Sequence, residues 1–372
     1  MIKIFHTADI HMGMKFRNYP EPVKSYLQEA RADVLDNMIK LANEEKCNLF
    51  IIAGDLFDKI TGIDKKTIGR ATAALNNFQG ECVLVMPGNH DYDNGMIELW
   101  DNFLKNVSNK IVFINEEWTY SLEDYGLNAV VYPAPCHAKH SSTNKLQWIK
   151  ETKTDNNYIN IGIAHGALEG LSPDLENSYY NMSIKELQSI PMDLWLLGHT
   201  HITYPFKSPI ANEKIFNPGT PEPDGLDCKH NGQAWIITID ENRKTNAELV
   251  QTGTYKFTDR VYAIEDKDDL DRILDELKKD EPEKTIARIT LNGSVDEDVF
   301  EYRQEIYSSI EKNIIYLIVE DSDFKMKITK EKIHREFSDG SFPQEFLLSL
   351  SDDEDTLQLA YELIMEVRNN DN

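Results

Sequence analysis

Residues 49–58 read LFIIAGDLFD, and residues 82–91 read CVLVMPGNHD. Both stretches join a short apolar run to a polar turn that contains glycine, which is typical of a buried strand followed by a loop. The same combination occurs near the start of the chain, where KIFHT at 3–7 precedes Asp9-Ile10-His11. We therefore expect buried strands whose carboxyl ends carry polar side chains.

Further apolar runs predict three more buried strands, at residues 129–132, 159–164 and 194–197. Residues 23–45 instead carry apolar side chains at helical spacing, which predicts a helix with one core-facing side. Alternating strands and helices are typical of an α/β layered sheet, in which functional residues lie in loops at the carboxyl ends of strands. Residues 214–256 turn to strands, most clearly at 233–240. The pattern predicts an α/β (α+β sandwich) domain of two sheets flanked by helices.

The composition changes after residue 256, which predicts a small α+β domain. An acidic helical pattern covers residues 268–280. Three further stretches of this domain follow at 285–291, 298–311 and 314–319.

The end of the chain predicts a helical segment. Residues 342–350 form an apolar cluster, and Ser351 and Glu354 have the spacing of a capping box, so the last helix is expected to start at Ser351. The expected domains are 1–256, 257–335 and 336–372.

The length and the composition of the chain indicate an ordinary globular protein. A chain of 372 residues exceeds the size at which one core keeps growing, so two or more domains are expected. The four cysteines are widely spaced, which predicts reduced thiols rather than a zinc ribbon. No apolar run approaches the roughly 18 residues of a membrane span, and no signal peptide precedes the first motif, so we expect a cytoplasmic protein.

The net charge of −25 argues at first against a polyanionic substrate, because nucleic-acid binders usually carry a basic surface. Residues 255–372, however, hold 16 Lys and Arg against 31 Asp and Glu, a net charge of −15. Most of the acidity therefore lies outside the region that carries the motifs.

Five polar elements follow apolar runs: Asp9-Ile10-His11, Gly54-Asp55, Gly88-Asn89-His90-Asp91, His165-Gly166 and Gly198-His199-Thr200-His201. Asp, Asn and His supply oxygen and imidazole ligands that suit Mn²⁺, Fe²⁺ or Zn²⁺, and no thiolate indicates a closed structural zinc site. Each element alone occurs by chance in many proteins, but the ordered set favours a catalytic metal site. The other histidines are interpreted as ordinary polar or core residues: His6, His137, His140, His230 and His334.

The ordered set resembles the signature of the calcineurin-like metallophosphoesterases. The resemblance implies a two-sheet phosphoesterase core and two divalent ions. One ion would be held by Asp9, His11, Asp55 and His201, and the other by Asp55, Asn89, His165 and His199. Asp55 would bridge the two.

The same resemblance implies a catalytic role for His90. Beside the ligand Asn89, its imidazole can donate to the phosphate and protonate the departing alkoxide. Asp91 would orient that ring, although a carboxylate at this position can also cap its own loop.

The motifs GDLFD, PGNHD, AHG and GHTH, with NPGTPE at 217–222, resemble the SbcD type of DNA repair nuclease. That resemblance implies exonuclease and endonuclease action on DNA, with Mn²⁺ as the first choice of ion and Fe²⁺, Mg²⁺ or Zn²⁺ as alternatives. It also implies a capping domain at 257–335, a homodimer, and docking of 336–372 on an SbcC-like coiled-coil ATPase. Packing of this last segment on its own capping domain is the alternative. One departure is Asp58, where some relatives have a histidine near the metals.

Two other functions stay open. A phosphodiesterase of small or cyclic nucleotides would tolerate the acidic surface, and a structural subunit would hold its metal without catalysis. A protein phosphatase is disfavoured, because the Arg expected after the second motif and the Glu expected after His90 are missing.

Overall fold

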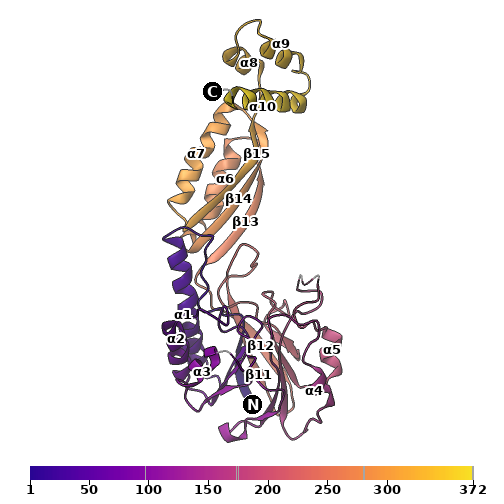
Figure 1. Ribbon diagram of the computed structural model, residues 1–372. Coiled ribbons are helices and arrows are strands. Elements are labelled where there is room, and N and C mark those ends of the chain that lie inside the picture. The colour runs from indigo at the N-terminus through magenta and orange to yellow at the C-terminus, as the bar shows by residue number, and fades with distance from the viewer. Residues whose placement is uncertain (97, 173, 175, 280, 371–372) are drawn as a thin grey trace. The chain divides into compact units, whose positions relative to one another are not determined.

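The computed structural model describes residues 1–96, 98–172, 174, 176–279 and 281–370 (Figure 1). The chain divides into two compact units, Met1–Phe257 and Thr258–Asn372. The further division at residue 335 remains a prediction. None of the helices in the described part of the chain combines the length and the apolar character needed to cross a membrane.

The first unit is built on two sheets. Within the described residues, one sheet has the strand order β4-β3-β2-β1-β11-β12-β9 and the other β10-β8-β7-β6-β5. The first comprises β4 (Ile111–Phe113), β3 (Cys82–Met86), β2 (Leu49–Ala53), β1 (Ile2–Thr7), β11 (Gln233–Ile239), β12 (Thr245–Gln251) and β9 (Ile210–Ala211). The second comprises β10 (Ile215–Phe216), β8 (Leu194–Gly198), β7 (Ile159–His165), β6 (Ala129–Ala134) and β5 (Tyr120–Ser121).

Apolar side chains from both sheets fill the space between them, including Ile4, Ile51, Ile163 and Leu196. Because both faces of the central strands are buried, these strands are continuous apolar runs rather than alternating ones.

Helices cover the outer faces of the two sheets (Figure 1). The helices α1 (Val23–Glu44), α2 (Lys65–Asn76) and α3 (Glu98–Leu104) pack on the first sheet, and α4 (Gln147–Glu151) and α5 (Ile184–Ser189) on the second. A short 3₁₀ turn, η1 (Glu123–Tyr125), follows β5. The predicted two-sheet core flanked by helices is confirmed.

The parallel strands of the two sheets determine where the motif loops lie. β1, β2 and β3 are mutually parallel, as are β6, β7 and β8. Their carboxyl ends therefore deliver the loops that follow them to one edge of each sheet.

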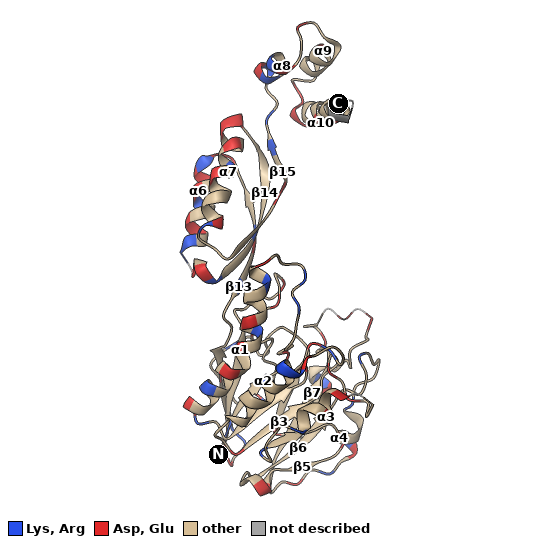
Figure 2. Ribbon diagram, turned by 60° about the vertical axis from the view of Figure 1, so that its left-hand side comes forward, with Lys and Arg blue, Asp and Glu red and all other residues tan. Residues whose placement is uncertain are grey.

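The second unit begins with a sheet in the order β13-β14-β15. Its elements are β13 (Lys256–Ala263), α6 (Lys267–Lys278), η2 (Pro282–Lys284), β14 (Thr285–Val295), α7 (Glu297–Glu311) and β15 (Tyr316–Met326). Leu270 and Ile306 pack α6 and α7 on Ile289 of β14. Asp and Glu residues recur along both helices, with Lys and Arg residues between them (Figure 2). The expected end of the first helix, Asp280, lies outside the described residues.

Three helices end the chain: α8 (Lys330–Glu336), α9 (Phe342–Ser349) and α10 (Glu354–Asn370). They share a small core that contains Ile333, Leu347 and Leu357. The predicted helix start at Ser351 is wrong. The Asp353 carboxylate accepts a hydrogen bond of 3.1 Å from the Thr356 N–H, so α10 begins one residue after Asp353.

Candidate metal centre

The motif residues follow the carboxyl ends of strands from both sheets. Asp9 and His11 follow β1, Asp55 follows β2, and Asn89, His90 and Asp91 follow β3. β7 ends at His165, and His199 and His201 follow β8. These side chains, which are up to about 190 positions apart in the sequence, lie together in one cluster. His90, His199 and His201 are partly exposed and the other motif residues are buried.

Four of the predicted ligands have left-handed backbone conformations, with φ of 56° at Asp9, 51° at His11, 55° at Asp55 and 91° at His199. Non-glycine residues avoid this region, and such strain gathers at functional sites. Backbone hydrogen bonds hold it in place: the Asp9 N–H donates to the Gly54 carbonyl at 3.1 Å, and the His11 N–H donates to the Asp55 carbonyl at 3.0 Å. The loops are thus tied to one another before any ligand binds.

Gly54 allows the closest approach in the site. Its φ is 97°, and a Cβ at this position would lie 2.0 Å from Nδ1 of His165. No other residue type leaves room for the imidazole beside this strand end.

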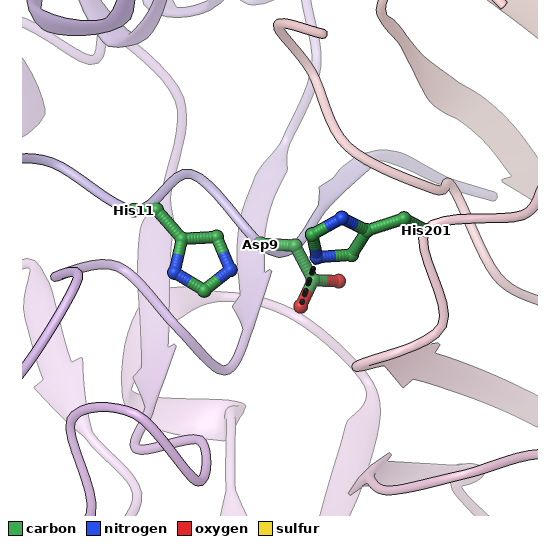
Figure 3. A group of neighbouring side chains, drawn as sticks. All are labelled: Asp9, His11 and His201. Carbon is green, nitrogen blue, oxygen red and sulfur yellow. Dashed lines mark ion pairs between the residues drawn. The ribbon is translucent and has the colours of Figure 1, made fainter. Parts of the chain in front are cut away.

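The first group of ligand atoms comes from Asp9, His11 and His201 (Figure 3), whose nitrogen and oxygen atoms lie within 4.8 Å of one another. Nε2 of His201 is 3.7 Å from Oδ1 of Asp9. Nδ1 of the same ring is 3.1 Å from a carboxylate oxygen of Asp224. A carboxylate there keeps the proton on Nδ1 and turns the Nε2 lone pair toward the cluster.

The second group contains Asp9, Asp55 and His165, again with ligand atoms within 4.8 Å. The amide oxygen of Asn89 lies 3.0 Å from Nε2 of His165 and 2.8 Å from Nδ1 of His199. Nδ1 of His165 donates to the Ala53 carbonyl at 2.7 Å, which fixes the tautomer of that ring.

Asp55 lies between the two groups. One of its carboxylate oxygens is 3.7 Å from Nε2 of His11 and 3.3 Å from Nε2 of His165. Its other oxygen accepts the His90 N–H at 2.8 Å. This central position suits a carboxylate that contacts two ions.

The electrostatics favour a cation. Burial alone would lower the pKa of His165, but the carboxylates of Asp55 and Asp9 outweigh it and raise that pKa to about 9. Burial would raise the pKa of Asp55, but His165 and His11 bring it well below its ordinary value. A divalent ion bound at Nε2 of His165 would replace the proton held there. The imidazole and carboxylate donors therefore fit a divalent transition metal.

Asp91 and His90 differ from the expected pair. The Asp91 carboxylate accepts the N–H groups of Phe57 at 3.0 Å and of Gly88 at 2.7 Å. Nδ1 of His90 instead faces the carbonyl of Asp58 at 3.1 Å. The orienting contact of His90 is thus a backbone carbonyl, and Asp91 caps the loop. The loop-cap alternative accounts for Asp91, because two backbone donors already use its oxygens.

Asp224 and Asp58 join the site without having been assigned a role in the sequence. Asp224 lies two residues beyond the motif NPGTPE. Its position beside this motif was the one sequence signal that could have identified it. The Asp58 carboxylate is 4.0 Å from Nδ1 of His11, and these two residues form a third group with His90. His230 also approaches, because its Nε2 is 3.1 Å from the His201 carbonyl.

Comparison with known proteins adds a family and several relatives. The sequence model of the calcineurin-like phosphoesterases matches residues 2–203. The uncharacterized metallophosphoesterase YhaO of Bacillus subtilis (strain 168) is 26% identical over 210 residues, or 54% of this chain and 48% of that protein.

Two relatives are nuclease SbcCD subunits D. The Staphylococcus saprophyticus protein is 25% identical over 232 residues, which cover 57% of this chain and 59% of that protein. The Bacillus subtilis protein is 30% identical over 92 residues, which cover 24% of this chain and 22% of that protein. The chain spans 59% or less of the length of each of these three relatives.

One solved structure, that of TT1561 of Thermus thermophilus, matches 68% of this chain and 99% of its own at a TM-score of 0.40 and 12% identity. That likeness is too low to carry an argument about the site.

Proposed function

This chain belongs to the calcineurin-like phosphoesterase family, whose members are metal-dependent phosphoester hydrolases, and we propose that it is a DNA nuclease that cleaves phosphodiesters with two divalent ions. The observation that carries the proposal is that two ligand groups lie side by side, with one carboxylate oxygen of Asp55 3.7 Å from His11 of the first group and 3.3 Å from His165 of the second. The similarity to two nuclease SbcCD subunits D supports DNA as the substrate.

Each ion has its own set of side chains in this proposal. Asp9, His11 and His201 would hold one, His165, Asn89 and His199 would hold the other, and Asp55 would contact both. When bound, two such ions activate water and offset charge on the attacking and leaving oxygens of an in-line displacement.

His90 then acts on the phosphate rather than on the ions. Because the Asp58 carbonyl accepts the proton of Nδ1, Nε2 is the nitrogen that exchanges a proton with the leaving oxygen. The His90 N–H is anchored on Asp55, so the ring keeps a fixed place beside the ligands. A positioned donor of this kind contributes about 10²- to 10⁴-fold to the rate.

The proposal extends to partners. Binding of an SbcC-like ATPase through 336–372 is proposed, and the two relatives that are subunits D of the nuclease SbcCD support such a partner. Homodimer formation and Mn²⁺ as the working ion are proposed from the resemblance of the motifs alone. Apolar side chains on α10, namely Leu359, Leu363 and Val367, are more than half exposed, which supports an interaction through this helix.

The test is degradation of an end-labelled linear DNA duplex by the full chain with Mn²⁺, beside Asp55→Asn and His90→Ala proteins. His334→Ala serves as the matched histidine control, because His334 lies on α8 in the second unit. We expect the wild-type and control proteins to shorten DNA and the two site variants to be inactive. Activity should also fall steeply with salt, since DNA contacts release counterions.

A chromogenic phosphodiester run in parallel separates the competing functions. Cleavage of the small diester but not of DNA, with weak salt dependence, would replace the nuclease by a small-nucleotide phosphodiesterase, which the net charge of −25 favours. Binding of Mn²⁺ without cleavage of either substrate would leave a structural metal site.

A further inference from the structure

Arg31 is a buried cation behind the metal centre. It lies on the inner face of α1 and is only 1% exposed, which is rare for an arginine. Nη1 donates to the carbonyl of Ile10 at 3.1 Å and to the hydroxyl of Thr220 at 3.3 Å. Among the described residues, Nε and Nη2 have no hydrogen-bond partner, so the structure keeps a costly group here.

One acceptor of Arg31, the Ile10 carbonyl, belongs to the turn that carries two ligands, and the other, the Thr220 hydroxyl, contacts that turn from a distant segment. Ile10 stands between Asp9 and His11, whose backbones are left-handed. The hydroxyl of Thr220 is 3.0 Å from the Asp9 carbonyl and 2.8 Å from the Glu222 carbonyl, and its single proton serves one of them at a time. Arg31 and Thr220 thus hold two successive carbonyls of a strained turn from behind.

The third ligand of the same group has a different support, because Nδ1 of His201 lies 3.1 Å from the Asp224 carboxylate. By contrast, the ring hydrogen bonds described for His165 and His199 go to Ala53 and Asn89.

We propose that Arg31 is a positioning residue for one of the two ions, because with Thr220 it holds the Asp9–His11 turn from behind. Its removal therefore weakens the ion on the Asp9, His11 and His201 side and spares the other. This inference rests on the proposed two-ion function.

The experiment measures bound Mn²⁺ per chain by equilibrium dialysis, and the spin coupling of the ion pair by electron paramagnetic resonance. Arg31→Met should lower the affinity for one ion by about 10- to 100-fold, the range seen when outer partners of ligands are removed. It should resemble His201→Ala and differ from His199→Ala, which removes a ligand on the opposite side. Arg31→Lys keeps the charge and a donor for Ile10, so it should restore most of the lost affinity.

Arg70 provides the matched control. It lies on α2 and pairs with Asp33 and Asp36 on α1, away from Ile10 and Thr220, so Arg70→Met should bind two ions like the wild type. If Arg31→Met does not fold, Thr220→Val must weaken the same ion and Thr220→Ser must restore it. Equal loss of both ions in a folded variant, or loss of neither, overturns the inference.

The same measurements separate this inference from the proposed function. One possible result is that the wild type binds two ions, Arg31→Met binds one, and neither protein cleaves DNA. This result would refute DNA as the substrate and uphold the role of Arg31. A wild-type chain that binds no Mn²⁺ would refute both.

Discussion

Replacement of Gly88 by alanine should disable the site through a single methyl group. A Cβ at position 88 would lie 2.2 Å from Oδ1 of Asp55 and 2.5 Å from the Asp55 backbone nitrogen. Real Cβ contacts essentially never fall below 3.0 Å, so the carboxylate or its loop must move by about 0.8 Å, the difference between 3.0 and 2.2. A displacement of about 1 Å in a positioned group costs about a hundredfold in rate. We therefore expect Gly88→Ala to lower kcat about a hundredfold.

The assay is steady-state hydrolysis of a chromogenic phosphodiester and of labelled duplex DNA at saturating Mn²⁺, with urea unfolding to verify that the variant folds. Gly69→Ala is the control, because a Cβ at that exposed position in α2 meets nothing within 4 Å. It should keep full activity and raise the free energy of unfolding by about 0.5–1 kcal/mol. Activity of Gly88→Ala within about twofold of the wild type would refute both the bridging position of Asp55 and the requirement for glycine.

Three further changes probe other parts of the first unit. His90→Gln should lower kcat by about 10²- to 10⁴-fold with the Mn²⁺ content unchanged, because it removes a proton donor and no ligand. Steady-state kinetics with metal analysis tests this, and loss of bound metal would contradict it. Asp224→Asn should weaken Mn²⁺ binding by about 10- to 100-fold in calorimetric titration, because Nδ1 of His201 loses its carboxylate. The exposed Asp227→Asn is its control. Burial lowers the pKa of His6 from 6.5 to about 3. Below pH 6.5, His6 is therefore protonated in the unfolded chain but stays neutral in the folded chain. The free energy of unfolding should thus fall by about 2 kcal/mol between pH 6.5 and about pH 5 because of this group. In urea unfolding with EDTA, the free energy of unfolding of the His6→Gln protein should fall less steeply with pH. An equally steep fall would refute the argument.

The strands and the motifs were predictable because both depend on local sequence. A strand buried on both faces must be a continuous apolar run, and β2, β3 and β8 each appear as one. Polar side chains that follow such runs are then expected at one edge of a sheet. Local pattern was therefore sufficient to select the residues that meet in the cluster.

The partners of these residues were not predictable, because they depend on approaches between distant segments. Asp224 lies 23 positions after His201, beyond the short strands β9 and β10, and no periodicity marks such a carboxylate. The pairing of Asp91 with His90 was expected from their adjacency in sequence. In the structure the two backbone donors at Phe57 and Gly88 take the Asp91 oxygens, because a buried carboxylate must satisfy its acceptors nearby.

A similar competition explains the start of α10. Ser351 and Glu354 have capping-box spacing, but Asp353 is also a strong capping residue, and it supplies the cap two residues later. The sequence spacing allows more than one N-terminal capping residue. The packing of Leu357 against Ile333 and Leu347 then determines which turn of the helix faces the small core. Tertiary contacts therefore decide between local signals of equal strength.

The charge of the site explains how an acidic chain can act on a polyanion. Among the described residues, Asp9, Asp55, Asp58 and Asp224 bring carboxylates to the cluster, while burial and the charge of Asp55 raise the pKa of Asp91 to about 7. Without ions these carboxylates repel a phosphate, and two divalent ions supply opposite charge of about the same size. The ions are therefore needed to admit the phosphate as well as to cleave it. Because coupling between two bound species is reciprocal, the proposed DNA substrate should strengthen the binding of the ions by the same factor by which the ions strengthen its own binding.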